Sequence, residues 1–441
     1  MSDVAVVVLD TLRLDAFQRR FEWLPGRRYT NAYAPGHWTV PVHGAMFTGL
    51  YPSEVGVHAK AQHLDTDRRV LAERLAAAGY TTRAFSANPY VSPVFGFDRG
   101  FEEFEGSWRL RQLDPALFDW TRFSDETAEE GPTRYLRALA RCVRGDCATL
   151  SSLRFGLRLK LRESDPFGGV ADDGAQATLE YVRETSFGSE EFLYLNLMEA
   201  HTPYDPPADY TTTDVTHGGG LEGTITGDDV DPAPVRQAYD DCVRYLSDVY
   251  ERIYAALAEE FHYVLTVSDH GELLGEHGGW AHGYGLFPEL TNVPVVLSGP
   301  DVADGTSTEL VSLLDVHATV QDAAGIDADS RGRSLLGEQP MTDCLTEYHG
   351  LTARRVEKLE DAGVPADLIA EYDQTFRGIA GPSDYGYRTP EGFVATGTAD
   401  VDPEDRLATL VTDLDVAEPT GDDDSDHSDD VISQLEDLGY A

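Results

Sequence analysis

Hydrophobic and polar residues along this chain divide it into short apolar runs and longer amphipathic stretches. Residues 4–10, VAVVVLD, form a β-branched apolar run typical of a buried strand. Residues 71–79 carry apolar side chains at helical spacing and end at a glycine, as an amphipathic helix does. Further strands are predicted at 81–86, 191–197, 262–268 and 293–297, a loop at 30–36, and further helices just after residue 41 and near 176–186, 233–259 and 311–324. This alternation predicts an α/β fold: a doubly wound, mostly parallel sheet with helices on both faces.

The alternation of strand and helix is interrupted in two places. Residues 105–175 are charged, aromatic and partly helical, without regular strand spacing. From about residue 340, short strands such as 344–349 and 393–396 are separated by turns, which predicts a small α+β subdomain. The predicted division is a main α/β domain at 1–340 with an insertion or lid at 105–175, and a C-terminal subdomain at 341–441 with an acidic linker at 421–430 and a terminal helix at 431–438.

The composition adds a strong charge imbalance. The chain has 441 residues, 41% of them hydrophobic, which is enough for a large core. With 34 basic and 78 acidic residues its formal net charge is −44, and only three basic residues are lysines. A surface of this kind predicts a halophilic protein, because high salt screens its self-repulsion. It also argues against a nucleic-acid partner, since no basic stripe is expected to neutralise phosphates.

The sequence shows no segment for membrane insertion. No apolar run approaches 18 residues. The first predicted strand begins at residue 4 and leaves no room for a signal peptide, so a cytoplasmic location is expected. The four cysteines lack zinc-ligand spacing, and a reducing interior would keep them as thiols.

Two predicted strands end at residues that can bind a cation. Asp10 closes the first strand, and Asp269 and His270 follow the strand at 262–268. The carboxyl ends of parallel strands meet at one edge of a sheet, so these side chains are expected to lie together. Two carboxylates and an imidazole suit one Ca²⁺, Mn²⁺ or Mg²⁺ ion, with Zn²⁺ as an alternative. For either strand alone, an acid that only caps a turn is an equally good interpretation, but the pair favours a metal site.

A hydroxyl near the start of a predicted helix is the candidate reacting group. Thr39 precedes Pro41 by two residues, and proline is favoured in the first turn of a helix. Unpaired backbone N–H groups and the helix dipole at that position favour an anionic ester oxygen. A nearby cation lowers the pKa of a hydroxyl, which makes Thr39 a candidate nucleophile. Taken alone, Thr39 fits the role of a helix N-cap better than that of a nucleophile.

Short motifs follow one another along the chain in a characteristic order. Thr39-Val-Pro-Val-His43 begins the series. The others are MFTGLYP at 46–52, GVH at 56–58, MEAHTPY at 198–204, SDHGELLGEHG at 268–278, HG at 282–283, NVPV at 292–295 and LEDLGY at 435–440. Together they resemble the motifs of the sulfatase family, which belongs to the alkaline-phosphatase-like superfamily. The resemblance spans most of the chain apart from 105–175, and it implies that residues 1–340 form a catalytic α/β domain.

The resemblance also implies roles for individual residues. Asp10, Asp269 and His270 would bind one divalent metal, and Thr39 would complete its shell. His201, in a His-x-Pro context, would bind the ester or protonate the leaving oxygen.

Other residues are implied in supporting roles. His282 would contact the anion as a third catalytic residue beside Thr39 and His201. His43 would support the nucleophile segment, and His58 and Lys60 fall in a stretch that often contributes anion contacts. For His43, His58 and His277, a purely structural role is an equally good interpretation.

The nucleophile position departs from that of sulfatases. Sulfatases carry a Cys or Ser that is oxidised to formylglycine, and threonine cannot give that aldehyde. The first strand ends in Asp10-Thr11, where many sulfatases have two adjacent acids. In both respects the chain resembles the phosphonate and phosphodiester hydrolases and the phosphoglycerol transferases of the superfamily. They imply that Thr39 attacks phosphorus and that water or an alcohol then releases the intermediate.

The sequence therefore predicts a metal-dependent hydrolase or transferase that acts on phosphate or sulfate esters through Thr39. Two alternatives stay open: a sulfuric ester hydrolase with an unmodified hydroxyl, and an inactive relative that binds an anionic ligand. The complete set of acids and histidines argues against the inactive relative. The expected partners are small-molecule, glycan or lipid-headgroup esters, with no nucleic acid and no integral membrane segment.

Overall fold

A computed structural model of the protein describes most of the chain. The described residues are 2–112, 117, 118, 120, 123, 127, 134–144, 147–163, 172–227, 230–327, 329–337 and 340–417. The predicted acidic linker at 421–430, the terminal helix at 431–438, the motif at 435–440 and parts of the 105–175 insertion lie outside them.

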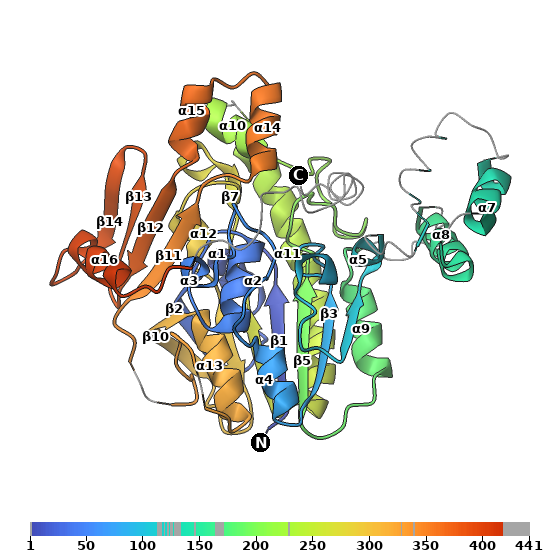
Figure 1. The fold of residues 1–441 in the computed structure, drawn as a ribbon, viewed down its shortest axis with the longest axis horizontal. Coiled ribbons are helices and arrows are strands. Elements are labelled where there is room, and N and C mark those ends of the chain that lie inside the picture. The colour runs from blue at the N-terminus through green and yellow to red at the C-terminus, as the bar shows by residue number, and fades with distance from the viewer. Residues whose placement is uncertain are drawn as a thin grey trace.

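An eight-stranded, mostly parallel sheet forms the centre of the molecule (Figure 1). Its strands are β1 (Val4–Leu9), β2 (Arg27–Tyr33), β3 (Thr81–Ser86), β4 (Glu103–Gly106), β5 (Glu191–Leu197), β6 (Tyr263–Val267), β9 (Val295–Ser298) and β10 (Gly305–Ser312). Hydrogen bonds order them β10-β2-β9-β6-β1-β5-β3-β4. β9 runs antiparallel to both of its neighbours. The sheet has the doubly wound character expected from the sequence.

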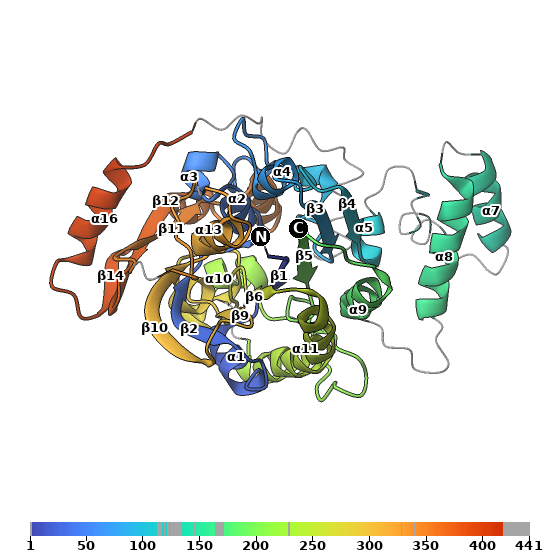
Figure 2. The same cartoon turned by 90° about the horizontal axis from the view of Figure 1, so that it is seen from below.

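Helices cover both faces of this sheet, and alternate residues of β1 show why. Val4, Val6 and Val8 pack in one core and the residues between them pack in the other. One face carries α2 (Thr39–Thr48), α3 (Pro52–Val55), α4 (Leu71–Ala77) and α13 (Leu314–Ala323); the other carries α1 (Leu14–Arg20), α9 (Ala175–Glu184) and α11 (Pro232–Glu260) (Figure 2). A strand buried on both faces needs a continuous apolar run, which is the pattern of β1, β5 and β6.

The C-terminal part of the chain forms a second, smaller sheet. It is antiparallel, with the order β11-β12-β13-β14. The strands are β11 (Cys344–His349), β12 (Thr375–Ala380), β13 (Asp384–Thr389) and β14 (Gly392–Gly397), and the accompanying helices are α14 (Ala353–Asp361), α15 (Ala366–Tyr372) and α16 (Pro403–Thr412). The predicted small α+β unit is therefore confirmed.

Two elements differ from the sequence-based expectation. The predicted loop at 30–36 is wrong over its first half, because β2 extends to Tyr33 between β9 and β10. The predicted helix near 311–324 begins at Leu314, since the residues before it form β10.

The inserted segment contains helices that stand away from the central sheet. After β4 come α5 (Trp108–Gln112), α7 (Arg134–Arg144) and α8 (Thr149–Glu163). Both views place α7 and α8 beside each other at one side of the molecule (Figures 1 and 2). Within the described residues, every helix is too short or too polar to cross a membrane. The smaller remaining elements are η1 (Pro93–Phe95), α10 (Gly220–Thr226), β7 (Leu273–Leu274), η2 (Glu276–Gly278), β8 (Trp280–Ala281) and α12 (Pro288–Thr291).

Candidate active site

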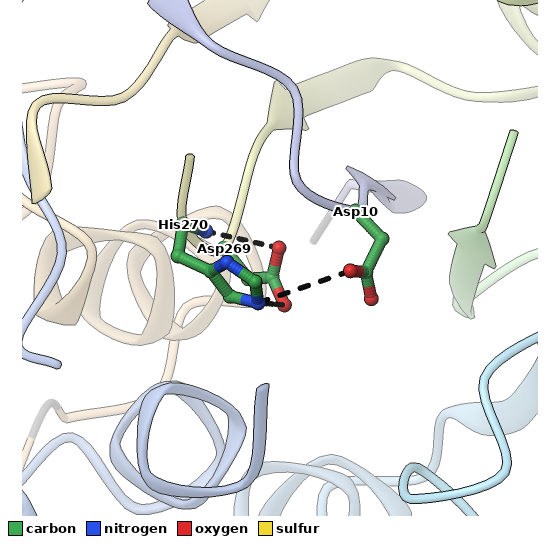
Figure 3. A group of neighbouring side chains, drawn as sticks. All are labelled: Asp10, Asp269 and His270. Carbon is green, nitrogen blue, oxygen red and sulfur yellow. Dashed lines mark hydrogen bonds and ion pairs between the residues drawn. The ribbon is translucent and has the colours of Figure 1, made fainter. Parts of the chain in front are cut away.

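The carboxyl ends of two adjacent strands bring the candidate metal ligands together. β1 pairs in parallel with β6, so Asp10 and Asp269, which follow them, reach the same edge of the sheet. Asp10, Asp269 and His270 are fully buried. One ligand atom from each lies within 4.8 Å of the other two (Figure 3). This is the cluster that the strand ends predicted.

The donor atoms of this cluster suit a divalent cation. Asp10 Oδ1 and Asp269 Oδ2 are buried and have no hydrogen-bond partner among the described residues. His270 Nε2 lies 3.8 Å from the first oxygen and 3.5 Å from the second. His270 Nδ1 lies 2.9 Å from the carbonyl oxygen of Gly271, so it carries the proton and Nε2 keeps its lone pair. The two carboxylate oxygens and the His270 Nε2 lone pair therefore face one point. Two hard oxygens with one nitrogen fit Ca²⁺, Mn²⁺, Mg²⁺ or Zn²⁺.

Burial makes the two carboxylates reluctant to ionise by themselves. Burial, together with the charge of Asp269, raises the pKa of Asp10 to about 8. Burial also raises the pKa of Asp269 to about 7. A divalent cation offsets both effects, since it favours the charged form of each ligand. Cation binding at this cluster would therefore be coupled to proton release.

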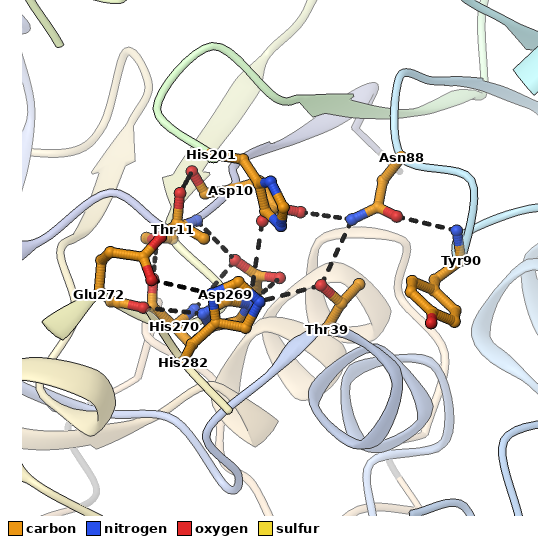
Figure 4. A network of polar contacts seen from close by, with 12 residues as sticks. Asp10, Thr11, Thr39, Asn88, Tyr90, His201, Asp269, His270, Glu272 and His282 are labelled. Atoms are coloured by element: carbon orange, nitrogen blue, oxygen red, sulfur yellow. Dashed lines mark hydrogen bonds and ion pairs between the residues drawn. The ribbon is translucent and has the colours of Figure 1, made fainter. Parts of the chain in front are cut away.

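Thr39 turns its hydroxyl toward the same cluster. Its Oγ1 lies 3.4 Å from His270 Nε2 and accepts a 3.3 Å hydrogen bond from Asn88 Nδ2 (Figure 4). α2 begins at Thr39, two residues before Pro41, and Trp38 takes the N-cap position. The interpretation of Thr39 as a simple N-cap is therefore wrong.

Two asparagines that the sequence analysis did not identify hold the site in place. Asn88, just beyond β3, donates to Asp10 Oδ2 at 2.7 Å as well as to Thr39. Its own Oδ1 accepts from the backbone N–H of Tyr90, which fixes the orientation of the amide. Asn196 on β5 donates to Asp10 Oδ2 at 3.5 Å. Asn88 follows a predicted strand at the same sheet edge, so the rule that found Asp10 also points to it.

His201 and His282 line the site close to the metal ligands. The His282 ring centroid lies 4.6 Å from that of His270 and 5.0 Å from that of His201. His282 Nδ1 lies 3.0 Å from Glu272 Oε1, and His201 Nδ1 lies 2.5 Å from the carbonyl oxygen of Thr202. Burial lowers the pKa of both histidines well below the usual value, so both are neutral. Burial raises the pKa of Glu272 to about 8.

The remaining histidine and lysine candidates take other positions. His43 Nδ1 lies 2.9 Å from the carbonyl oxygen of Thr39, and its burial lowers its pKa to about 3, so it supports the nucleophile segment as a neutral group. Lys60 Nζ donates to Asp373 and to the Leu351 carbonyl oxygen, both at 2.6 Å. His58 stacks on His349, and His277 pairs with Glu289. Neither these two histidines nor Lys60 lines the cavity described next.

A cavity of about 320 Å³ opens over Thr39, His201 and His282. Its wall includes aromatic residues and two cationic residues from α14, Arg355 and Lys358. The Arg355 guanidinium lies 5.6 Å above the ring of Trp38 and donates to the Gly283 carbonyl oxygen at 3.4 Å. Within the described part of the chain, Arg355 has no ion pair with a carboxylate. A cation in this position suits an anionic ligand, because a half-buried charge without a counter-ion is costly.

The family model for sulfatases matches residues 19–326, well over half of the chain. The chain belongs to the sulfatase family. Among curated relatives, a choline-sulfatase of Rhizobium meliloti (strain 1021) is 25% identical over 348 residues, which make up 72% of this chain and 62% of that protein. A sulfatase of Formosa agariphila is 28% identical over 123 residues, 26% of this chain and 24% of that protein. The chain therefore spans less than two thirds of the length of either relative.

Solved structures of sulfatase relatives share the fold. A phosphonate monoester hydrolase of Agrobacterium radiobacter superposes with a TM-score of 0.60 and 16% identity, covering 100% of this chain and 94% of that chain. The phosphonate monoester hydrolase of Silicibacter pomeroyi has the same TM-score and identity, with 93% and 94% covered. A 2-O GAG sulfatase gives a TM-score of 0.57 at 14% identity, with 100% and 94% covered. The alkaline-phosphatase-like fold expected from the sequence is confirmed.

Proposed function

We propose that this protein is a metal-dependent ester hydrolase or transferase that acts on phosphate or sulfate esters, with Thr39 as its nucleophile. The observation that carries the proposal is the position of the Thr39 hydroxyl. It lies 3.4 Å from His270 Nε2, and Thr39 lines a cavity beside two carboxylate oxygens that have no hydrogen-bond partner among the described residues. Such a cluster can bind an anionic ester and activate a hydroxyl at once.

The metal would be held by Asp10, Asp269 and His270, with Thr39 as the fourth ligand. When bound, a divalent cation lowers the pKa of the hydroxyl and stabilises negative charge on the ester. Asn88 restrains both sides of this arrangement, because its amide donates to Asp10 and to Thr39. Arg355 supplies a positive charge at the cavity wall for the anionic ester.

In the first step, Thr39 Oγ1 gives its proton to His201 Nε2 and forms a bond to phosphorus, and the bond to the leaving oxygen breaks. The leaving oxygen needs a proton, and the Glu272–His282 pair can supply it. With its pKa near 8, Glu272 is protonated at neutral pH and donates to His282 Nδ1, which places a proton on Nε2. His282 then passes that proton to the leaving oxygen and takes the proton of Glu272 in exchange.

In the second step, water or an alcohol gives its proton to His282 Nε2 and attacks phosphorus, and the bond to Thr39 Oγ1 breaks. His282 returns the proton on its Nδ1 to Glu272, and His201 returns its proton to Thr39 Oγ1. We assign the acceptance of the Thr39 proton in the first step to His201. Its Nδ1 is engaged by the Thr202 carbonyl oxygen, so Nε2 carries the lone pair and a neutral His201 accepts a proton rather than donating one. The resemblance implied that His201 binds the ester or protonates the leaving oxygen, and this assignment differs from the second of these roles.

Phosphate esters are favoured over sulfate esters because Thr39 cannot become formylglycine. Among the structural neighbours, two are described as phosphonate monoester hydrolases. The second candidate is a sulfuric ester hydrolase with an unmodified hydroxyl, which is favoured by the similarity to a protein described as a choline-sulfatase. An inactive anion-binding relative is the third.

A substrate panel distinguishes these three candidate functions. Purified protein is assayed in high salt with Ca²⁺, Mn²⁺, Mg²⁺ or Zn²⁺ against aryl phosphate monoesters, diesters, phosphonates and sulfates. The proposal predicts metal-dependent turnover of at least one phosphorus ester, abolished in Thr39→Ala. Turnover of sulfates alone would contradict the phosphoryl assignment, and metal-dependent ligand binding without any turnover would favour the inactive relative.

A further inference from the structure

The helices α7 and α8 form a hairpin whose exposed surface differs from that of the rest of the protein. Both views show the two helices beside each other and apart from the central sheet (Figures 1 and 2). Ala138, Cys142 and Ser152 are buried on their inner sides. The hairpin thus has its own small interior, and several other side chains of its two helices are exposed to solvent.

This segment is basic, whereas the chain as a whole is acidic. Residues 134–163 contain eight arginines or lysines and two acidic residues, a formal charge of +6. Subtracting +6 from the net −44 leaves −50 on all other residues. Arg137, Arg141 and Arg144 are exposed on α7 at spacings of four and three residues, which places them on one side of the helix. The composition of the whole chain concealed this basic stripe.

The hairpin also carries much of the exposed apolar surface. Seven large hydrophobic side chains are exposed in the described part of the chain, and four of them lie here. They are Leu139 (45% exposed), Val143 (62%), Leu150 (73%) and Leu157 (61%). Leu150 and Leu157 share one side of α8 with the exposed Arg154, at spacings of four and three residues. Exposed leucine beside exposed arginine is the composition of an amphipathic helix that lies in a membrane surface.

We propose that the α7–α8 hairpin docks the protein on the surface of an anionic lipid bilayer. Its arginines would pair with the negative headgroups and its leucines and valines would enter the boundary of the acyl region. The acidic remainder of the protein would be repelled, so only the hairpin would approach the membrane. This docking is independent of the ester chemistry proposed above.

A second copy of the chain fits this surface less well. The other exposed large hydrophobic side chains of the described residues are three valines, Val394, Val401 and Val416, which offer no comparable apolar face. Contact between two hairpins would bring like charges together. An anionic bilayer satisfies both the arginines and the apolar side chains.

Co-sedimentation with vesicles tests the proposal. The full chain is mixed with phosphatidylglycerol vesicles or phosphatidylcholine vesicles at the lowest KCl concentration that preserves its far-UV circular dichroism spectrum. We expect sedimentation with phosphatidylglycerol only. The double variants Arg144→Glu/Arg154→Glu and Leu150→Asn/Leu157→Asn should each weaken binding by at least about tenfold, since each removes two surface contacts.

Matched variants separate docking from general effects of charge or polarity. Arg183→Glu/Arg252→Glu reverses two exposed arginines on α9 and α11, and Val394→Asn/Val401→Asn removes two exposed valines near the C-terminal sheet. Both controls should bind as the unaltered protein does. Absence of sedimentation, or equal binding by the hairpin variants, would overturn the proposal. A dimer in size-exclusion chromatography that only the hairpin variants dissociate, without vesicle binding, would assign the surface to a second copy.

Discussion

At the scale of single residues, the hydrogen-bonded pair Glu272–His282 is proposed to control the proton that the leaving oxygen receives. Glu272 is fully buried next to His282, and burial raises its pKa to about 8. The proton-bearing form of Glu272 is therefore present below pH 8 and is lost as the pH rises through that value. Because a protonated Glu272 is what places a proton on His282 Nε2, the acid that serves the leaving group should disappear over the same range.

The pH dependence of turnover checks this assignment. We expect kcat to fall above about pH 8 in the unaltered protein. Glu272→Gln keeps a donor to His282 but has no proton to transfer, so kcat should drop by about 10² and the fall above pH 8 should vanish. A variant that retains the alkaline fall would show that another group titrates there.

We expect Arg355 to contribute more to binding of the anionic ester than to the chemical step. Its guanidinium lies at the cavity wall over Trp38 and has no carboxylate partner among the described residues. Arg355→Met preserves the length of the side chain without the charge, and we expect KM for an anionic ester to rise by about 10- to 100-fold, as for a lost hydrogen bond to a charged group. Arg355→Lys should recover part of the loss, and Arg183→Met on the exposed side of α9 should have no effect. An unchanged KM in Arg355→Met would remove Arg355 from the binding site.

At the scale of elements, the ends of the buried strands were predictable and the polar strands were not. β1 and β6 are continuous apolar runs because both faces of the sheet are covered, and each delivers an acid to the same edge. β2, with the sequence RRYTNAY, has no such pattern, and its pairing with β9 and β10 determines its conformation. Local sequence therefore gave a loop where tertiary contacts make a strand.

The same limit applies to the site. Asp10, Asp269 and His270 follow predicted strands, and Thr39 lies in a motif, so each could be found from local sequence. Arg355 reaches the cavity from α14, far along the chain, and nothing in its neighbourhood marks it as a site residue. Tertiary packing places it there, since Leu359 of α14 packs with Ile225 of α10 and Ile369 of α15.

Asp373, which directly follows α15, restrains the segment that contains α14 and Arg355. Asp373 accepts hydrogen bonds from Lys60 Nζ at 2.6 Å and from the Leu351 backbone N–H at 2.8 Å, which ties the start of this segment to the main body. Asp373→Ala should lower the free energy of unfolding by about 1–2 kcal/mol and raise KM, because both bonds are lost. Chemical denaturation and steady-state kinetics measure the two effects. Asp361→Ala, at the exposed end of α14, is the matched control, and equal behaviour of the two variants would refute this role.

At the scale of the whole molecule, the buried acids link stability to pH and to metal. The pKa values of about 8 and 7 for Asp10 and Asp269 lie above those of an unfolded chain. Without metal, these groups therefore favour the folded state at low pH and lose that contribution as the pH rises through 7 to 8. A cation needs both carboxylates ionised, so its stabilising effect should grow over the same range.

Thermal unfolding tests this linkage. The increase in Tm on adding a divalent cation should be larger at pH 8.5 than at pH 6, and Asp269→Asn should abolish it at both values. An increase that is equal at both pH values would contradict metal binding at these carboxylates. The same scans at several KCl concentrations test whether the protein is halophilic. Halophily, the cytoplasmic location and the role of residues 105–175 as a lid stay predictions.

The central claim is that Thr39 becomes covalently bonded to the substrate. Mass spectrometry of protein quenched during turnover of a phosphorus ester, with metal present, tests it directly. We predict an added phosphoryl or phosphonyl group on the peptide that contains Thr39, absent when Thr39→Ala is treated in the same way. An adduct on another residue, or turnover by Thr39→Ala at the rate of the unaltered protein, would contradict the account.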